Sequence, residues 1–126
     1  MTGRGTTRYA DIAVGDVYSF EQVLERQHGA LFAELTGDAT DTGTLHGMLA
    51  ASFFSALIDI YGPGPDSVHV SQTLQFRKPL RYGETVTVRG EILTKSNATR
   101  IITIQTDILS GSEKAITGEA KIQLPR

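Results

Sequence analysis

The stretch Gly47–Ile60, GMLAASFFSALIDI, is apolar almost without interruption. Its hydrophobic side chains fall on every side of a helix rather than along one stripe, and such a helix is usually buried. The helix is ended by four helix-breaking residues that follow it, Gly62, Pro63, Gly64 and Pro65. The sequence therefore predicts one long buried helix, over about residues 47–60, at the centre of the fold.

After this helix the hydrophobic residues recur at every second position. Val68, Val70, Leu74 and Phe76 share one face of a predicted strand that Pro79 ends. Three further runs alternate in the same way: Val86, Val88 and Ile92; Ile102, Ile104 and Ile108; and Ile116, Ala120, Ile122 and Leu124. Short polar turns at residues 96–98 and 110–112 join these runs, a pattern typical of an antiparallel meander.

The N-terminal third predicts one more strand and one more helix. Val17–Leu24 has β-branched and aromatic residues in partial alternation, which favours a strand. Arg26–Thr36 changes to a helical period, and Gly37 follows as a C′ residue. Residues 1–8 are polar and glycine-rich, so we expect them to be flexible.

These elements define a fold class without reference to any family. The apolar face of the meander must be covered, and the helix over residues 47–60 is the only element able to cover it. We predict a single α+β domain over residues 1–126: a hotdog fold, in which a curved antiparallel sheet wraps around one long central helix. Such a sheet leaves an edge strand unpaired, so we also expect a homodimer.

The composition excludes several classes of function. A net charge of −2 and a pI near 5.9 give no electrostatic case for binding nucleic acid or an anionic membrane. No apolar run approaches the roughly 18–20 residues of a membrane-spanning helix, and the N-terminus lacks the apolar stretch of a secretory signal. The chain has no cysteine and only three histidines, so we expect no disulfide, no structural metal and a cytoplasmic location.

Four short pieces, in this order, carry a resemblance to a known family. They are FAELTGD at Phe32–Asp38, HGMLAAS at His46–Ser52, VSQTLQFRKPL at Val70–Leu80 and GETV at Gly83–Val86. Together they resemble the MaoC-like, (R)-specific enoyl-CoA hydratases, which have the hotdog fold. The resemblance implies a lyase of fatty acid metabolism that reversibly hydrates a trans-2-enoyl thioester of CoA or of an acyl carrier protein. It implies no cofactor beyond the CoA or phosphopantetheine of the substrate.

The resemblance also assigns roles to individual residues. Asp38 matches the catalytic aspartate and is the candidate general base. Gly47 matches the glycine whose amide contributes to the oxyanion hole, with His46 beside it. Met48 and Ser52 follow on the same helix as candidates for binding the substrate.

The segment after Asp38 departs from the family pattern. The family continues with x-Asn-Pro-x-His, which carries the catalytic histidine, and then with a long loop. Here only residues 39–45 separate Asp38 from His46, and Asn-Pro-x-His is absent. The resemblance therefore assigns no residue to the catalytic histidine. Either His46 acts in its place, or His46 only orients the backbone at the start of the helix.

The spacer itself has two interpretations. Asp41, with Thr42 and Thr44, forms a polar loop whose carboxylate and hydroxyls could activate water for hydrolysis of a thioester. Alternatively, the loop is a turn in which Thr44 is the N-cap of the following helix. The other two histidines are predicted to be non-catalytic: His28 at the surface of the first helix, and His69 facing away from the core.

Three basic residues, Arg77, Lys78 and Arg81, surround Pro79 at the end of a strand. They either hold the phosphates of CoA or of phosphopantetheine, or form a solvated strand end.

The leading hypothesis for function is a hydratase or dehydratase, impaired by the loss of the catalytic histidine. Two alternatives are a thioesterase that uses Asp38 or Asp41, and a non-catalytic relative that binds thioesters or an active partner subunit. A further explanation of the short spacer is a loop lost from this version of the chain alone.

Overall fold

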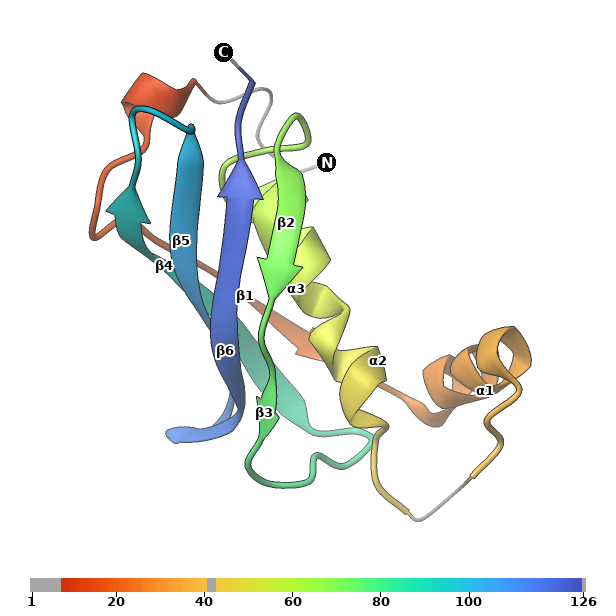
Figure 1. The fold of residues 1–126 in the computed structure, drawn as a ribbon. Helices are drawn as coiled ribbons and strands as arrows, with labels where there is room; N and C mark the ends of the chain where they lie inside the picture. Colours follow the sequence, from red (N-terminus) through yellow and green to blue (C-terminus); the bar gives the residue numbers. More distant parts are fainter. Residues whose placement is uncertain (1–7, 41–42, 126) are drawn as a thin grey trace.

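The computed structural model describes residues 8–40 and 43–125 (Figure 1). A short 3-10 turn, Tyr9–Asp11, precedes the first strand. The strands are β1 Val17–Val23, β2 Val68–Gln72, β3 Gln75–Phe76, β4 Thr85–Lys95, β5 Ile101–Ser110 and β6 Glu113–Gln123, and the helices are α1 Arg26–Thr36, α2 Gly47–Ala51, α3 Phe53–Ala56 and a π-helix over Leu57–Tyr61. Within the described residues, no helix is long and apolar enough to cross a membrane.

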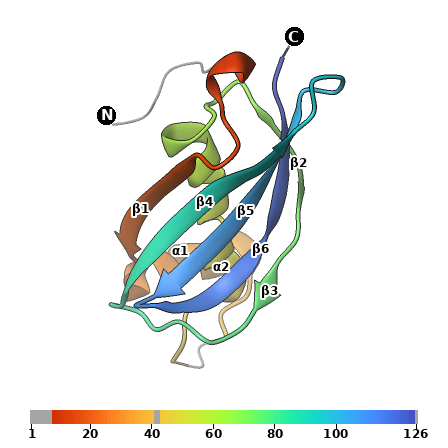
Figure 2. The same ribbon diagram turned by 90° about the vertical axis from the view of Figure 1, so that its left-hand side faces the viewer.

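The strands form one curved antiparallel sheet in the order β1-β4-β5-β6-β2, with β3 also paired to β6 (Figure 2). In its centre Ile92 lies opposite Ile104, and Ile104 lies opposite Ala120, and all three are buried. The predicted meander and both of its turns are therefore confirmed. The alternating residues place every second side chain of these three strands toward the helix.

The helical segments α2, α3 and the π-helix run together along the concave face of the sheet (Figures 1 and 2). Phe54, Leu57 and Ile58 are buried against it. Leu57 packs into one cluster of core side chains and Ile58 into the other, so this helix joins both halves of the core. The arrangement confirms the predicted hotdog fold, with its long central helix.

The prediction that this helix is buried on all sides is wrong. Met48, Ser52, Ser55 and Asp59 are exposed. They are spaced three or four residues apart, so they form one stripe along the helix. The sheet covers only the opposite side, which leaves this exposed stripe facing outward.

The segment from Val68 to Phe76 also differs from the single strand that was predicted. It is broken into β2 and β3, with a register shift between His69 and Ser71. Val68, Val70 and Phe76 are 62%, 51% and 52% exposed, although their spacing predicted a core-facing row. The reason is position: β2 is at the edge of the sheet, and none of these three side chains belongs to either cluster of core side chains. His69 is exposed, in agreement with its prediction.

The segment between β2 and β3 crosses directly over Gly118 of β6. Thr73 accepts a hydrogen bond from the amide of Glu119 through its hydroxyl, at 2.8 Å, and donates its own amide to the carbonyl of Glu119, at 2.9 Å. A Cβ atom on Gly118 would lie 1.8 Å from the carbonyl oxygen of Thr73. Only glycine allows the two backbones to approach this closely.

Helix α1 has the predicted bounds and ends at Gly37, whose φ of 78° is the left-handed conformation of a C′ glycine. Its N-terminus is closed by a capping box, in which the backbone amide of Glu25 donates to Nδ1 of His28 at 3.0 Å. His28 is half-buried, so the predicted exposed position is wrong. The predicted flexible segment is outside the described residues, except for Arg8.

No residue of α1 is buried, and Leu31 and Leu35 are 61% and 85% exposed. Figure 1 shows this helix to one side of the sheet, beside the start of α2. Helix α1 is therefore a lightly packed addition to the body of the fold.

Candidate active site

Asp38 and His46 lie together at the start of the central helix. Gly37 reverses the chain after α1 and brings Asp38 back toward α2, where His46 occupies the N-cap position. The Oδ2 atom of Asp38 is 3.9 Å from Nδ1 of His46, and their side chains are 48% and 22% exposed. This separation is too long for a direct hydrogen bond.

Two contacts fix the imidazole ring of His46. Its Nε2 atom lies 3.0 Å from the carbonyl oxygen of Thr40, and its ring stacks on Phe32 with centroids 4.8 Å apart. Because a carbonyl oxygen only accepts, Nε2 must carry a proton. In the neutral ring Nδ1 then carries the lone pair, and it lies 3.9 Å from the Asp38 carboxylate.

The Asp38 carboxylate is held in its ionised form. The backbone amide of Thr40 donates to Oδ1 of Asp38 at 3.1 Å. The side-chain hydrogen bond from Thr40 and then this backbone bond lower the pKa of Asp38 below its ordinary value, and the positive charge of a protonated His46 lowers this pKa further. In addition, the amide of Asp38 donates to Oγ1 of Thr36 at 3.1 Å, which orders the turn.

A cavity of about 240 Å³, here called the Asp38 cavity, surrounds this pair. The small side chains of α1 leave the room for it, and the guanidinium of Arg26 lies over the ring of Tyr82 at 5.4 Å. Its lining residues are Arg26, Gly29, Ala30, Ala33, Asp38, Ala39, Thr40, His46 and Tyr82.

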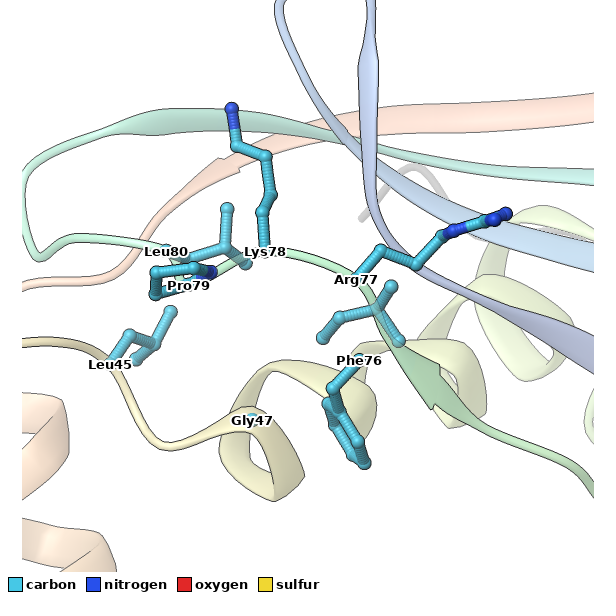
Figure 3. Close-up of a pocket in the computed structure, with 8 residues that line it drawn as sticks. Leu45, Gly47, Phe76, Arg77, Lys78, Pro79 and Leu80 are labelled. Atoms are coloured by element: carbon cyan, nitrogen blue, oxygen red, sulfur yellow. The ribbon is translucent and has the colours of Figure 1, made fainter.

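A second cavity of about 330 Å³, here called the Phe76 cavity, lies beside the first turn of the central helix (Figure 3). Leu45 and Gly47 line it, whereas the side chain of His46, between them, lines the Asp38 cavity. The lining residues are Leu45, Gly47, Phe76, Arg77, Lys78, Pro79, Leu80 and Ile116. Consecutive residues of this segment, Leu45, His46 and Gly47, therefore line two different cavities.

Phe76 is a residue of this site that the sequence patterns did not identify. A Cβ atom on Gly47 would lie 2.6 Å from the Phe76 ring, so this glycine allows the ring to pack on the first turn of the helix. The alternation had assigned Phe76 only to the face of a strand. No local signal in the sequence pairs it with Gly47, because the contact joins two segments far apart in the chain.

The basic residues lie around the outside of the Phe76 cavity. Figure 3 shows the charged ends of Arg77 and Lys78 directed away from Gly47. The Nζ atom of Lys78 is 3.7 Å from a carboxylate oxygen of Glu113. Arg81 lies farther along the chain, where it lines a neighbouring depression together with Lys78.

The remaining predicted residues are placed less centrally. Met48 and Ser52 lie on the exposed stripe of the central helix, and the Ser52 hydroxyl donates to the carbonyl of Leu49 at 2.6 Å. The interpretation of Thr44 as the N-cap is wrong, because His46 occupies that position. The side chain of His46 makes no capping hydrogen bond. Asp41 and its neighbour Thr42 are outside the described residues.

Comparisons with known proteins agree with this fold. No family model matches the chain. A 3-hydroxybutyryl-CoA dehydratase of Methylorubrum extorquens is 30% identical over 94% of this chain and 84% of that protein. An (R)-specific enoyl-CoA hydratase of Rhodospirillum rubrum is 29% identical over 93% of this chain and 91% of that protein. The solved structure of an (R)-hydratase from Aeromonas caviae matches with a TM-score of 0.87 and 30% identity, over 90% of this chain and 98% of that one.

The chain belongs to the MaoC-like, (R)-specific enoyl-CoA hydratase family, as the four sequence pieces predicted. The roles assigned to individual residues remain predictions, which the contacts described above make specific enough to test.

Proposed function

We propose that this protein reversibly adds water to a 2-enoyl thioester, with its reaction centre at the Asp38–His46 pair. Membership of a family of hydratases and dehydratases supports the class of reaction. The observation that carries the proposal is the pair itself: an ionised carboxylate and an imidazole nitrogen, 3.9 Å apart, in a cavity at the start of the central helix. Two such groups at this separation can hold one water and take up its proton.

The thioester carbonyl has a place beside this pair. Water attacks Cβ, and negative charge develops on the thioester oxygen as an enolate forms. The amide of Gly47 is among the first of the central helix, where amides have no carbonyl partner within the helix. One peptide bond separates it from His46, so it is a donor for the developing oxyanion.

The Phe76 cavity suits the apolar part of the substrate. Its walls include Leu45, Phe76, Leu80 and Ile116, which favour an acyl chain over a charged group. Arg77, Lys78 and Arg81 surround it from outside, where the phosphates of CoA would remain near solvent. We therefore propose a CoA thioester as the substrate, and a carrier-protein thioester becomes an outcome of the test.

We also propose that the single domain works as a homodimer. Strand β2 is at the edge of the sheet, and four of its five residues are exposed. Pairing this edge with a second copy would satisfy its backbone groups and cover Val68 and Val70. Light scattering on the purified protein is expected to give about twice the mass of 13.6 kDa. A monomer at micromolar concentration would contradict this.

The activity is tested with crotonyl-CoA, by following the loss of the enoyl absorbance. Asp38→Asn should slow hydration by about 10²–10⁴-fold, because the amide cannot act as an anion or a base. Asp59→Asn is the matched control, since Asp59 is an exposed aspartate on the outer stripe of the central helix.

Other results would replace the proposal. Release of free thiol from acyl-CoA, without hydration, indicates a thioesterase. CoA binding without either reaction indicates a non-catalytic relative. Hydration of the carrier-protein thioester alone changes the substrate but leaves the reaction in place.

A further inference from the structure

We propose that His46 is the proton-carrying residue of this reaction, in place of the histidine that the family motif would supply, with Asp38 as its fixed anionic partner. The inference rests on the proposed hydration and assigns its proton transfers. It concerns this chain in particular, because the spacer of residues 39–45 lacks the Asn-Pro-x-His segment of the family.

The geometry of the pair suits one water molecule. Nδ1 of His46 and Oδ2 of Asp38 both accept hydrogen bonds, and they are 3.9 Å apart. A water at hydrogen-bonding distance, about 2.8 Å, from each atom fits across this separation. It would donate one proton to each acceptor, which leaves an oxygen lone pair directed away from both, toward the substrate.

The contacts of the two acceptors differ, and the difference selects His46 as the base. The Asp38 carboxylate already accepts hydrogen bonds from Thr40, which stabilise its charged form and lower its pKa. A carboxylate stabilised in this way is a poorer proton acceptor. Nδ1 of His46 has only the carboxylate opposite it among the interactions described above, and that negative charge stabilises an imidazolium once it forms.

Turning the ring over would break the hydrogen bond from Nε2 to Thr40, while the stack on Phe32 fixes the plane of the ring. The carbonyl of Thr40 accepts from Nε2 at 3.0 Å, and Phe32 stacks on one face of the ring. The first contact fixes the neutral tautomer, with the proton on Nε2 and the lone pair on Nδ1. Thr40 is thus a positioning residue for both groups: its amide and hydroxyl hold Asp38, and its carbonyl holds His46.

The resulting steps balance without any further reactant. The water oxygen bonds to Cβ while one water proton moves to Nδ1, and the Cα=Cβ electron pair moves toward the thioester to give the enolate. The imidazolium then returns the same proton from Nδ1 to Cα. The product carries the added OH at Cβ and the added H at Cα, and His46 is neutral again. Dehydration follows the same steps in reverse.

The first test compares His46→Asn with His69→Asn. Asparagine places an amide near the position of Nδ1, which retains hydrogen bonding but cannot take up a proton. The expected result is a fall in kcat of at least about 100-fold for His46→Asn. Binding of a saturated acyl-CoA should be unchanged, because the cavities remain. His69 is the matched control, an exposed histidine on β2 that bonds only Gln72 among the contacts described.

The second test is the pH dependence of kcat in the unmodified protein. A histidine base loses activity as the pH falls through the range in which histidines titrate, about pH 5–8. Asp38 stays ionised across this range because its pKa is lowered, and the other titratable groups that line the cavity are Arg26 and Tyr82. Nitrogen-15 NMR at the alkaline end of the range should show neutral His46 with its proton on Nε2.

These tests distinguish a failure of the proposed function from a failure of the assignment to His46 alone. If the unmodified protein does not hydrate or dehydrate thioesters, the proposed function is wrong and the assignment to His46 is lost with it. If the unmodified protein is active, three results overturn the assignment alone: a His46→Asn variant as fast as His69→Asn, an acidic limb confined to pH values below about 5, where carboxylates titrate, or a neutral ring protonated on Nδ1.

Discussion

The meander with its central helix and the segment around α1 differ sharply in how they are held. The meander and helix contain most of the buried side chains, among them Phe54, Ile104 and Ile122. Helix α1 has no buried residue and is tied to the body by side contacts, such as the stack of Phe32 on His46. The proposed reaction centre lies on the lightly packed side. The difference teaches that one part of this chain supplies stability and another supplies chemistry, as is common when a rigid scaffold carries a functional loop.

The largest expected difference between the two regions is in the free energy of unfolding of two alanine variants, one in each region. Phe54→Ala should lower the free energy of unfolding by about 3–5 kcal/mol, because it opens a cavity between the helix and the sheet. Leu35→Ala, on the exposed face of α1, should change it by less than about 0.5 kcal/mol. Urea denaturation measures both. Comparable losses would show that α1 is packed against something, such as a second copy of the chain.

Two glycine substitutions, one in each region, should show the same difference with a smaller change in stability. Gly118→Ala should cost about 1–3 kcal/mol, because the new methyl group meets the backbone of Thr73, which cannot move alone. In Gly29→Ala the methyl group meets only the end of the Tyr82 side chain, at 2.0 Å from its hydroxyl oxygen. That ring can swing aside, and alanine favours the helix by roughly 0.5–1 kcal/mol, so the net change should be near zero.

Urea denaturation of both variants, alongside the unmodified protein, is the measurement. Equal destabilisation at the two sites would mean that α1 is held as firmly as the sheet. A gain in stability for Gly118→Ala would mean that Thr73 does not cross as described.

The smallest expected effect is on a single titration. Thr40→Val removes the hydroxyl that contributes most to lowering the pKa of Asp38, so this pKa should rise toward its ordinary value. The rise should be partial, because the backbone amide of Thr40 still donates to the carboxylate. A lowered folded-state pKa adds stability above the unfolded pKa, and that stability is lost as the pH falls through the folded value. Thr40→Val should therefore be less sensitive to acid.

Carbon-13 NMR of the Asp38 carboxyl group measures this pKa directly. Thr36→Val is the control, because its hydroxyl oxygen accepts from the amide of Asp38 and does not contact the carboxylate. A pKa of Asp38 that rises equally in both variants would show that the turn as a whole, rather than the Thr40 hydroxyl, sets its value.

The fold could be predicted from the sequence where a pattern and its covering element were both present. The alternation in β4, β5 and β6 predicted the meander correctly, because residues of the central helix pack against those strands. The same alternation failed at Val68 and Val70. Alternation shows that a strand has an apolar face, but it does not show whether anything lies against that face, which depends on the strand's place in the sheet.

Part of the candidate site could also be predicted from the sequence, and part could not. A motif was enough to name Asp38 and His46 as candidates. Their separation of 3.9 Å could not be predicted, because it depends on the reversal at Gly37 and on the path of the spacer. The contact of Phe76 with Gly47 was also beyond prediction, since it is made between segments that only the folded sheet and helix bring together.

The π-helix at Leu57–Tyr61 gives the central helix an unusual tolerance to changes in length. One residue added to an α-helix turns everything before it by about 100° relative to everything after it. A π-helical turn contains an extra residue without that rotation, so Gly47 at one end and Tyr61, stacked on Phe20 at the other, both keep their orientation toward the sheet. We therefore expect a one-residue deletion within this turn to leave the proposed reaction centre aligned, whereas the same deletion in α2 or α3 would rotate it away.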